Sequence, residues 1–465
     1  MKLKFLGAAR QVTGSSYLIE TDESRILVDC GLYQERDYLY RNWQSFPVPP
    51  HQITHVLLTH VHIDHSGLIP KLVKEGFKGD VLLTPASKEL FPIVLLDSAR
   101  TQEEDAAFKK KRHGEEGRKG PRPEIPLYTV QDVENCLSQL KAVPYQQPVQ
   151  LDDKVMFCFH DAGHILGSAM IEVTVKDLGQ DKTIIFSGDI GQWNKPLLRD
   201  PSIFERADYV VMESTYGDRN HDSPQDAEDK LCNAVNDAIN AGGNLVIPTF
   251  AIERAQELVY HFNKLAGEGK IPYIMTFLDS PMAVEITKIF EQCIQYLDDE
   301  TQALFKSGKS PFEFPGLHLI ETVEGSKAIN LIKGSIVIMA GSGMITGGRI
   351  KHHLVRNISR PESILLLVGY QAVGTLGRQI QDGVSPVRIF GQLYPVRMKI
   401  QEIDGFSAHA DMGDLEHWLN SFKLPPKKVF LTHGEESSIL SLENYIRSKN
   451  GWTVAAPAYL EEFNL

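Results

Sequence analysis

Four side chains of the kind that bind metal ions lie within six consecutive residues of this chain. His60, His62, Asp64 and His65 directly follow an apolar, strand-forming run at 54–59. Alternate side chains of an extended segment face the same way, so His60 and His62 are placed to hold one ion together. Asp64 and His65 fall beyond the strand end, where they reach a second ion. The segment therefore predicts a site for two adjacent metal ions.

Three further polar residues follow apolar runs in the first half of the chain. They are Asp29 in ILVDCG, His164 in DAGHILGS and Asp189 in FSGD. Each is weak evidence alone, because a single His or an Asp after Ser-Gly is often a turn residue. In this order, and together with the segment 60–65, they resemble the signature motifs of the metallo-β-lactamase superfamily.

Length and composition indicate a globular protein with two domains. The chain has 465 residues, of which 42% are hydrophobic and 23% charged. No apolar run reaches the roughly 18 residues that span a bilayer, and the N-terminus lacks a signal-peptide pattern. We therefore expect a cytoplasmic protein without a membrane partner. Its five cysteines show no paired spacing, which indicates a reducing compartment and no Cys-based zinc site.

The charge balance bears on possible partners. A net charge of −12 disfavours a dedicated non-specific nucleic-acid binder, although carboxylates that hold metals contribute to it. The clearest basic stretch is 109–113, continued by Arg118, Lys119 and Arg122. We interpret the polar segment 113–126 as a solvated surface loop.

The spacing of apolar runs predicts an insertion. The first part has strand patterns at 2–8, 15–20, 25–29, 54–59, 80–84, 154–160, 169–175 and 183–189, and a helix at 86–110. From about 208, strands (209–212, 244–248, 273–277, 335–339, 363–368) alternate with helices (225–240, 253–266, 348–358), which predicts a parallel α/β sheet. After about 387 the earlier style returns, with a hairpin, helices at 412–422 and 437–448, and a strand at 428–431. We expect a domain at 208–386 between the two parts, 1–207 and 387–465, of another.

Three later motifs narrow the resemblance. Glu213 in ESTYG, His409 in FSAHAD and His433 in LTHGE resemble motifs A, B and C of the β-CASP branch of the superfamily. The stretches 340–344 and 369–376 also match it, so the resemblance covers essentially the whole chain. The chain is similar to the RNA-processing nucleases of that branch, which include bacterial and archaeal members and the polyadenylation cleavage nuclease. The resemblance implies an αββα metallo-β-lactamase fold with an inserted Rossmann-like parallel α/β domain, the β-CASP domain.

The resemblance also implies roles for individual residues. One zinc ion would be held by His60, His62 and His164, a second by Asp64, His65 and His433, and Asp189 would bridge them. Imidazole and carboxylate ligands without thiolate suit zinc in an open catalytic site. His409 would be the general acid and Glu213 its hydrogen-bond partner, so that His409, Glu213 and Asp189 take part in catalysis. Ser342 and Ser407 would contact substrate phosphate, although a Ser between small residues is most often only a turn residue.

The function implied is a zinc-dependent endoribonuclease. It would hydrolyse the phosphodiester bonds of single-stranded RNA by attack of a metal-bound hydroxide, with a histidine as general acid. The alternatives are a DNA-processing β-CASP nuclease and a small-molecule (thio)ester or lactam hydrolase. His433 argues against the first, because motif C tends to carry Val there, and the large insertion argues against the second. Whether the enzyme cleaves as an endonuclease or as a 5′-exonuclease stays open. Whether it forms a homodimer also stays open.

Overall fold

Two compact units make up the chain. The computed structural model describes residues 1–117, 123–177 and 180–465. The first unit consists of Met1–Trp193, Asp200–Asn220 and His409–Leu465, and the second of Asn194–Arg199 and His221–Ala408. Within these described ranges, no helix is long and apolar enough to cross a lipid bilayer.

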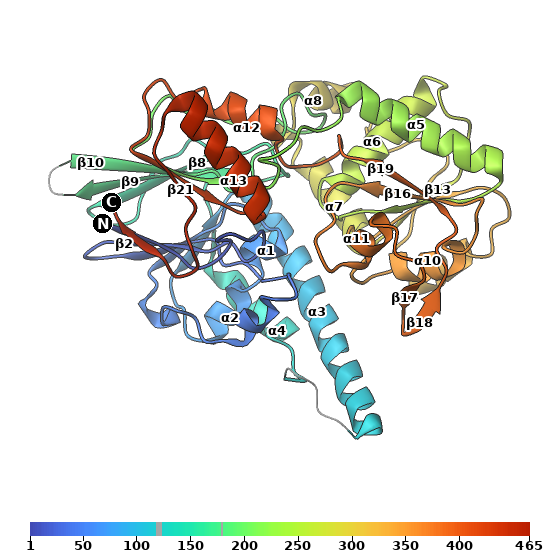
Figure 1. The fold of residues 1–465 in the computed structure, drawn as a ribbon, viewed down its shortest axis with the longest axis horizontal. Helices are drawn as coiled ribbons and strands as arrows, with labels where there is room; N and C mark the ends of the chain where they lie inside the picture. Colours follow the sequence, from blue (N-terminus) through green and yellow to red (C-terminus); the bar gives the residue numbers. More distant parts are fainter. Residues whose placement is uncertain (118–122, 178–179) are drawn as a thin grey trace. The chain divides into compact units, whose positions relative to one another are not determined.

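The first unit contains two seven-stranded sheets (Figure 1). In spatial order, one sheet has β22 (Glu462–Asn464), β1 (Lys2–Phe5), β2 (Tyr17–Glu20), β3 (Arg25–Val28), β4 (His55–Leu57), β5 (Asp80–Leu83) and β6 (Leu140–Ala142). The other has β21 (Val454–Ala455), β20 (Lys428–Thr432), β11 (Tyr209–Glu213), β10 (Gln180–Phe186), β9 (Ala169–Asp177), β8 (Val155–Asp161) and β7 (Val149–Gln150). Both sheets combine parallel and antiparallel pairs.

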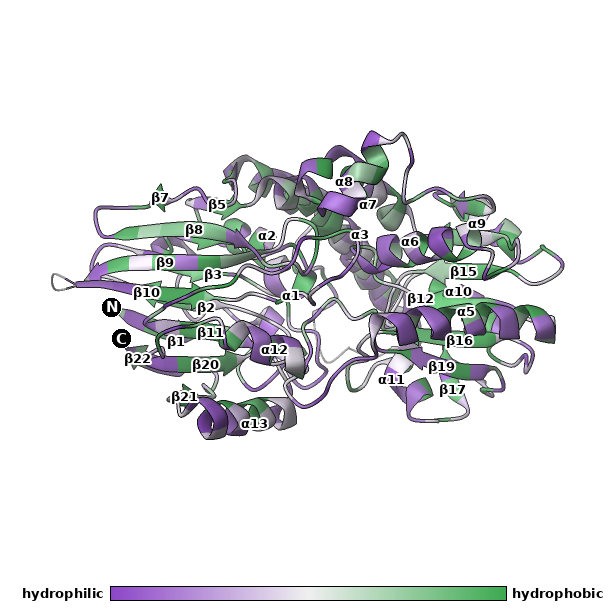
Figure 2. Cartoon of the chain, turned by 90° about the horizontal axis from the view of Figure 1, so that it is seen from above, coloured by the Kyte–Doolittle hydropathy of each residue, from purple (hydrophilic) through white to green (hydrophobic). Residues whose placement is uncertain are grey.

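A shared apolar core joins the two sheets. Phe5 and Ile26 of the first sheet belong to the same buried cluster as Phe157, Ile171 and Phe186 of the second. Alternate residues of a strand face opposite sides, and Figure 2 shows hydrophobic positions along the strands of both sheets. Removing these side chains from water is the main stabilising contribution that the sheets share.

Helices cover the outer faces of both sheets. On the second sheet, Leu415 and Trp418 of α12 (Met412–Leu419) and Leu442 of α13 (Glu436–Tyr445) form one buried cluster with Ile185 and Val210. The other helices of the unit are α1 (Ile63–Ser66), α2 (Ile69–Lys74), α3 (Pro85–Glu116) and α4 (Val130–Cys136), which lie on the side of the first sheet (Figure 1). The expected αββα arrangement is confirmed.

The second unit is a parallel α/β domain, as the alternation predicted. Its six-stranded sheet runs, in spatial order, β14 (Leu317–Leu319), β13 (Thr276–Asp279), β15 (Val337–Ala340), β12 (Leu245–Pro248), β16 (Ile364–Val368) and β19 (Lys399–Ile403), and every pair in it is parallel. The helices are α5 (Pro224–Ala241), α6 (Arg254–Gly267), α7 (Pro281–Gln292), α8 (Asp299–Lys306), α9 (Val323–Ile329), α10 (Ile350–Asn357) and α11 (Leu376–Gln381). A hairpin of β17 (Val387–Ile389) and β18 (Gln392–Tyr394) precedes β19.

The units end at other residues than the expected 208 and 386. β11 pairs with β10 and β20 in the first unit, although the apolar run at 209–212 leads into a strand–helix alternation. β19, beyond residue 386, pairs with β16 in the second unit. The unit to which a strand belongs depends on the strands with which it pairs, and the sequence of an apolar run does not specify those strands. The assignment of 1–207, 208–386 and 387–465 to named domains stays a prediction.

Helix α3 is longer than expected. It runs through the basic stretch and ends at Glu116, where Gly117 takes a left-handed conformation with φ of 63° and closes the helix. The prediction of a loop starting at residue 113 is therefore wrong for 113–116, because Gly114 is tolerated inside the helix and Gly117 is the stop. Arg118, Lys119 and Arg122 lie outside the described residues.

Candidate metal centre

The histidine-rich segment begins where β4 ends. β4 is flanked by β3 and β5, which pair with it in parallel. His60 and His62 lie in the extended segment after it, and Asp64 and His65 lie on α1. Gly31 lies so close to this loop that a Cβ there would come within 1.6 Å of the Asp64 carbonyl oxygen. The close approach of the two backbones holds the loop against the first sheet.

Four of the expected ligands form one group. The ring nitrogens of His60, His62 and His164 and a carboxylate oxygen of Asp189 all lie within 4.8 Å of one another. His62 Nδ1 is 3.0 Å from His60 Nε2 and 3.3 Å from His164 Nε2. The structure thus brings together residues that are 102 positions apart in the chain.

A second group of ligand atoms lies beside the first. Asp64, His65 and His433 again have their ligand atoms within 4.8 Å of one another, and His433 Nε2 is 3.5 Å from Asp64 Oδ2. His433 follows β20 and has a φ of 49°, which a non-glycine residue seldom adopts. Backbone strain of this kind often occurs where a side chain is held for function.

Asp189 faces both groups, one oxygen to each. Its Oδ2 lies 3.4 Å from His60 Nε2 and 3.5 Å from His164 Nε2. Its Oδ1 lies 3.3 Å from His65 Nε2 and 3.7 Å from His433 Nε2. A carboxylate placed in this way can bridge two cations.

The site fits divalent metal ions. Among the described residues, Asp189 Oδ1 and His433 Nε2 are buried without a hydrogen-bond partner, which is costly unless a cation or water satisfies them. Burial lowers the pKa of His62 to about 4 and holds the pKa of His60 well below its usual value. Both imidazoles are therefore neutral at pH 7, the form that binds metal. Burial would raise the pKa of Asp189, but the histidines around it, His433 first, hold that pKa well below the ordinary value.

Asp29 orients one of the expected ligands. Its buried carboxylate accepts hydrogen bonds from Thr59 N, Thr59 Oγ1 and His65 Nδ1, the last at 2.7 Å. His65 Nε2 is thereby directed toward Asp189. Burial lowers the pKa of His65, but Asp189 and Asp29 outweigh it and raise the pKa well above the usual value. A carboxylate behind a ligand histidine is the usual support of such a site.

His409 and Glu213 meet at the edge of the centre. His409 Nδ1 lies 3.0 Å from Glu213 Oε2 and 3.9 Å from Asp189 Oδ2. The His409 ring is also close to that of His164, with 4.6 Å between the ring centres. Burial would lower the pKa of His409, but Glu213 and Asp189 raise it to about 9. The two carboxylates therefore favour the protonated form of His409.

Two threonines were missed by the sequence analysis. Thr215 Oγ1 lies 2.6 Å from Glu213 Oε2 and 3.0 Å from His433 Nδ1, so it connects the two. Thr59 Oγ1 contacts Asp29 and lies 3.1 Å from His60 Nδ1. Their nearness to motif residues was the available signal, but a threonine at a strand end is common without such a role.

Ser342 and Ser407 belong to the second unit. Ser342 Oγ accepts hydrogen bonds from the backbone N–H groups of Thr346 and Gly347, as a turn-forming serine does. Ser407 is buried, and its N–H donates to the carbonyl of Asp404. Their contact with substrate phosphate stays a prediction.

Comparison with known proteins gives the family. Residues 9–138 match the metallo-beta-lactamase superfamily, 255–380 the Beta-Casp domain, and 393–457 the Zn-dependent metallo-hydrolase RNA specificity domain. Ribonuclease TTHA0252 of Thermus thermophilus is 38% identical over 443 residues, which cover 95% of each chain. This chain belongs to the β-CASP branch of the metallo-β-lactamase superfamily.

One further relative and one solved structure resemble this β-CASP protein. Transcription termination factor FttA of Methanosarcina mazei is 33% identical over 464 residues, which cover 97% of this chain and 69% of that protein. A crystal structure of a protein of unknown function from Enterococcus faecalis V583 matches all of this chain and 99% of its own, with a TM-score of 0.55 and 12% identity. The latter likeness concerns the fold alone.

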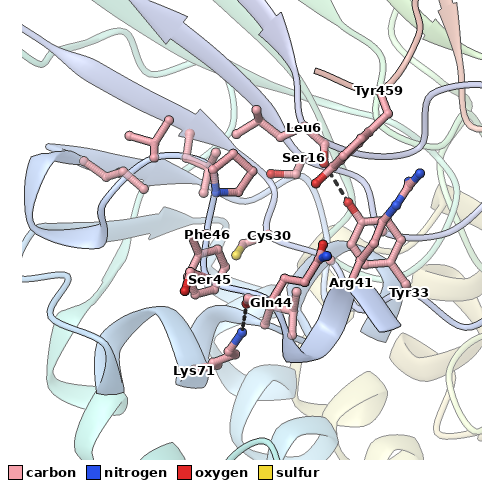
Figure 3. Close-up of a pocket in the computed structure, with 17 residues that line it drawn as sticks. Leu6, Ser16, Cys30, Tyr33, Arg41, Gln44, Ser45, Phe46, Lys71 and Tyr459 are labelled. Carbon is pink, nitrogen blue, oxygen red and sulfur yellow. Dashed lines mark hydrogen bonds between the residues drawn. The ribbon is translucent and has the colours of Figure 1, made fainter. Parts of the chain in front are cut away.

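A cavity apart from this centre lies beside Cys30 in the first unit of this β-CASP protein (Figure 3). Cys30 and Leu68 line it, and Cys30 N donates to the carbonyl of His65. Lys71 also lines the cavity. Its ammonium group donates hydrogen bonds to the carbonyls of Asn42 and Gln44. The hydrogen bond from Cys30 connects one residue of the cavity wall to the segment that carries the expected ligands.

Proposed function

We propose that this chain is a metal-dependent ribonuclease that hydrolyses phosphodiester bonds of single-stranded RNA. The observation that carries the proposal is Asp189, whose two oxygens face two separate groups of ligand atoms. The relationship to Ribonuclease TTHA0252 and the match to an RNA specificity domain support RNA as the substrate.

Two zinc ions are the metal content that we propose. His60, His62 and His164 would hold one, Asp64, His65 and His433 the other, and Asp189 both. Bound divalent ions would supply Lewis-acid stabilisation of the phosphate charge and make water more acidic. Zinc is proposed because the donors are imidazoles and carboxylates in a buried, four-donor arrangement.

His409 would supply the proton that the leaving 3′ oxygen needs. Glu213 Oε2 accepts from His409 Nδ1, so the proton to be transferred is the one on Nε2. Glu213 is in turn held by the N–H of Ile190 and the hydroxyl of Thr215. The carboxylate therefore positions the imidazole and keeps it protonated, and it does not itself need to touch the substrate.

The location and assembly of the enzyme are part of the proposal. We propose a cytoplasmic ribonuclease with endonuclease activity, and a homodimer as its assembly. The test of assembly is sedimentation at several protein concentrations, and a monomer at all of them would refute the dimer.

A cleavage assay tests the proposed activity. RNA labelled at its 5′ end and DNA of the same sequence are incubated with the purified protein, with and without a chelator. We expect cleavage of RNA well ahead of DNA, loss of cleavage with chelator and recovery on adding zinc. Equal cleavage of both strands would refute the RNA preference. Chelator-resistant cleavage would refute the metal dependence.

A further inference from the structure

The outer half of α3 has one covered and one open face. Ala106 and His113, seven residues apart, are buried, whereas all residues from 107 to 112 are exposed. The covered face is held by the chain returning toward α4, where Leu127 N donates to Gln102 Oε1 and Glu124 pairs with His113. In Figure 1 the open part of the helix points away from the sheets of its unit.

A short basic stretch lies on this open part of the helix, between the acidic residues 103–105 and 115–116. Four consecutive basic residues occupy 109–112 in a chain whose net charge is −12. Lys109 and Arg112 have acidic partners on the same helix, Asp105 at 3.6 Å and Glu116 at 2.8 Å. Lys110 and Lys111 have no ion-pair partner within the described part of the chain. Two ammonium groups are thus available to an anion from outside.

An exposed aromatic ring, that of Phe108, lies three residues before Lys111 and so on the same side of the helix. Phe108 is 65% exposed. Aromatic rings flanked by cations are typical of surfaces that bind single-stranded nucleic acid, because bases stack on the ring while phosphates contact the cations.

We infer that the basic turn 108–112 binds single-stranded RNA away from the metal centre. Lys110 and Lys111 would contact phosphates, and Phe108 would stack on a base. RNA is the occupant that complements both features, since a polyanion with flat bases matches cations around an exposed ring. The inference rests on the proposed ribonuclease function and adds a second contact for the same substrate.

The length of α3 sets the distance between the two contacts. The helix starts beside the His164 loop, where Thr84 Oγ1 and Ser87 Oγ both donate to the carbonyl of Gly167. At 1.5 Å per residue, residue 110 lies about 36 Å along the axis from residue 86. Stacked nucleotides at about 3.4 Å each would need roughly ten to cover that distance. Only RNA longer than this can use both contacts.

The test compares a short and a long RNA. One substrate is shorter than about ten nucleotides and the other about twice that length. For the wild type we expect a KM for the long RNA that is about tenfold below the KM for the short one. In the variant K110E/K111E this ratio should fall to near one. The salt dependence of long-RNA binding should weaken by about 1.4 in its logarithmic slope, which corresponds to two lost phosphate contacts. F108A should weaken long-RNA binding by about fivefold or more.

A matched control reverses the charge of two exposed lysines elsewhere in the first unit. Lys141 on β6 and Lys449 in the segment after α13 are both exposed. K141E/K449E should keep the wild-type KM ratio, which separates a local contact from overall charge. The melting temperature of each variant checks its folding, and K110Q/K111Q replaces a double variant that does not fold.

The outcomes separate the inference from the proposed function. If the wild type cleaves neither RNA, the ribonuclease proposal fails. If it cleaves both but K110E/K111E keeps the wild-type ratio and salt slope, the basic turn is not an RNA contact. An F108A variant that changes the sedimentation from dimer to monomer, with RNA binding intact, would assign Phe108 to a contact between copies and would overturn its stacking role.

Discussion

His409 Nδ1 lies 3.0 Å from Glu213 Oε2, although 196 residues separate the two in the chain. Glu213 ends β11 and His409 precedes α12, and most of the chain between them forms the second unit. The carboxylate accepts from Nδ1, so the ring has a fixed orientation beside His164 and Asp189. With Nδ1 engaged in this way, Nε2 is the His409 nitrogen that the proposed proton transfer would use.

Replacing His409 should remove the general acid and leave the metal ligands in place. We expect His409→Ala to lower cleavage of RNA by roughly 10²–10⁴-fold, the usual contribution of a positioned acid. Metal content measured by elemental analysis should not change, because His409 is not one of the seven proposed ligands. A variant that cleaves at the wild-type rate would show that another group supplies the proton.

The pH dependence of cleavage should report the Glu213–His409 pair. Glu213 and Asp189 raise the pKa of His409 to about 9 against the effect of burial, so the acid form persists at neutral pH and is lost as the pH rises through about 9. Cleavage should fall over that range. In Glu213→Gln one of the two charges that raise this pKa is gone, so the fall should begin at lower pH. Identical profiles of kcat against pH for the two proteins would contradict the role of Glu213.

His433 should be needed for one metal ion only. His433→Ala removes one of three ligands from the group of Asp64 and His65, while the group of His60, His62 and His164 keeps all its members. We expect about two zinc ions in the wild type, about one in the variant, and loss of most RNA cleavage. Elemental analysis after extensive dialysis gives the count. Full metal content and activity in the variant would rule out His433 as a ligand.

Thr215 should support the centre without binding metal. Its hydroxyl contacts both Glu213 Oε2 and His433 Nδ1, so Thr215→Val keeps the shape and removes both contacts. We expect a loss of about 10–100-fold in activity or metal affinity, as for other residues behind metal ligands. Thr215→Ser restores the hydroxyl and should recover most of the loss. Equal behaviour of the Val and Ser variants would show that the hydroxyl has no role.

The strained backbone and the buried carboxylate of Glu253 should both lower the free energy of unfolding. It has φ of 65° and ψ of −60°, and Arg254 N donates to the carbonyl of Ile252, which is the strained classic γ-turn. Its side chain is buried, and Oε2 has no hydrogen-bond partner among the described residues. Burial raises the pKa of Glu253 well above its usual value.

Two substitutions separate these costs. Glu253→Ala removes the carboxylate, and Glu253→Gly also removes the backbone strain. The glycine variant should therefore have a free energy of unfolding about 1–3 kcal/mol higher than that of the alanine variant. A group whose pKa is raised on folding stabilises less as the pH rises, so the gain of both variants over the wild type should grow from acid to neutral pH. Denaturant unfolding at two pH values measures both effects. A glycine variant no more stable than the alanine variant would show that the turn is not strained.

Local sequence patterns were enough to predict which side chains can bind metal ions and which segments form strands or helices. The spacing of His60, His62, Asp64 and His65 after an apolar run predicted a metal site, because a strand end followed by a turn leaves those side chains on one edge. The strand–helix alternation after residue 208 predicted a parallel sheet. These signals depend on neighbours in the chain, so a single sequence carries them.

Strand pairing and the contacts between distant side chains could be seen only in the folded protein. β11 pairs with β10 and β20, and β19 pairs with β16, each with strands that lie far away in the chain. Thr215 connects Glu213 to His433 because parallel pairing of β11 and β20 places the ends of the two strands together. The open basic face of α3 depends on the chain returning along its other side. Such contacts join residues far apart in the chain, and no local pattern encodes which of them will meet.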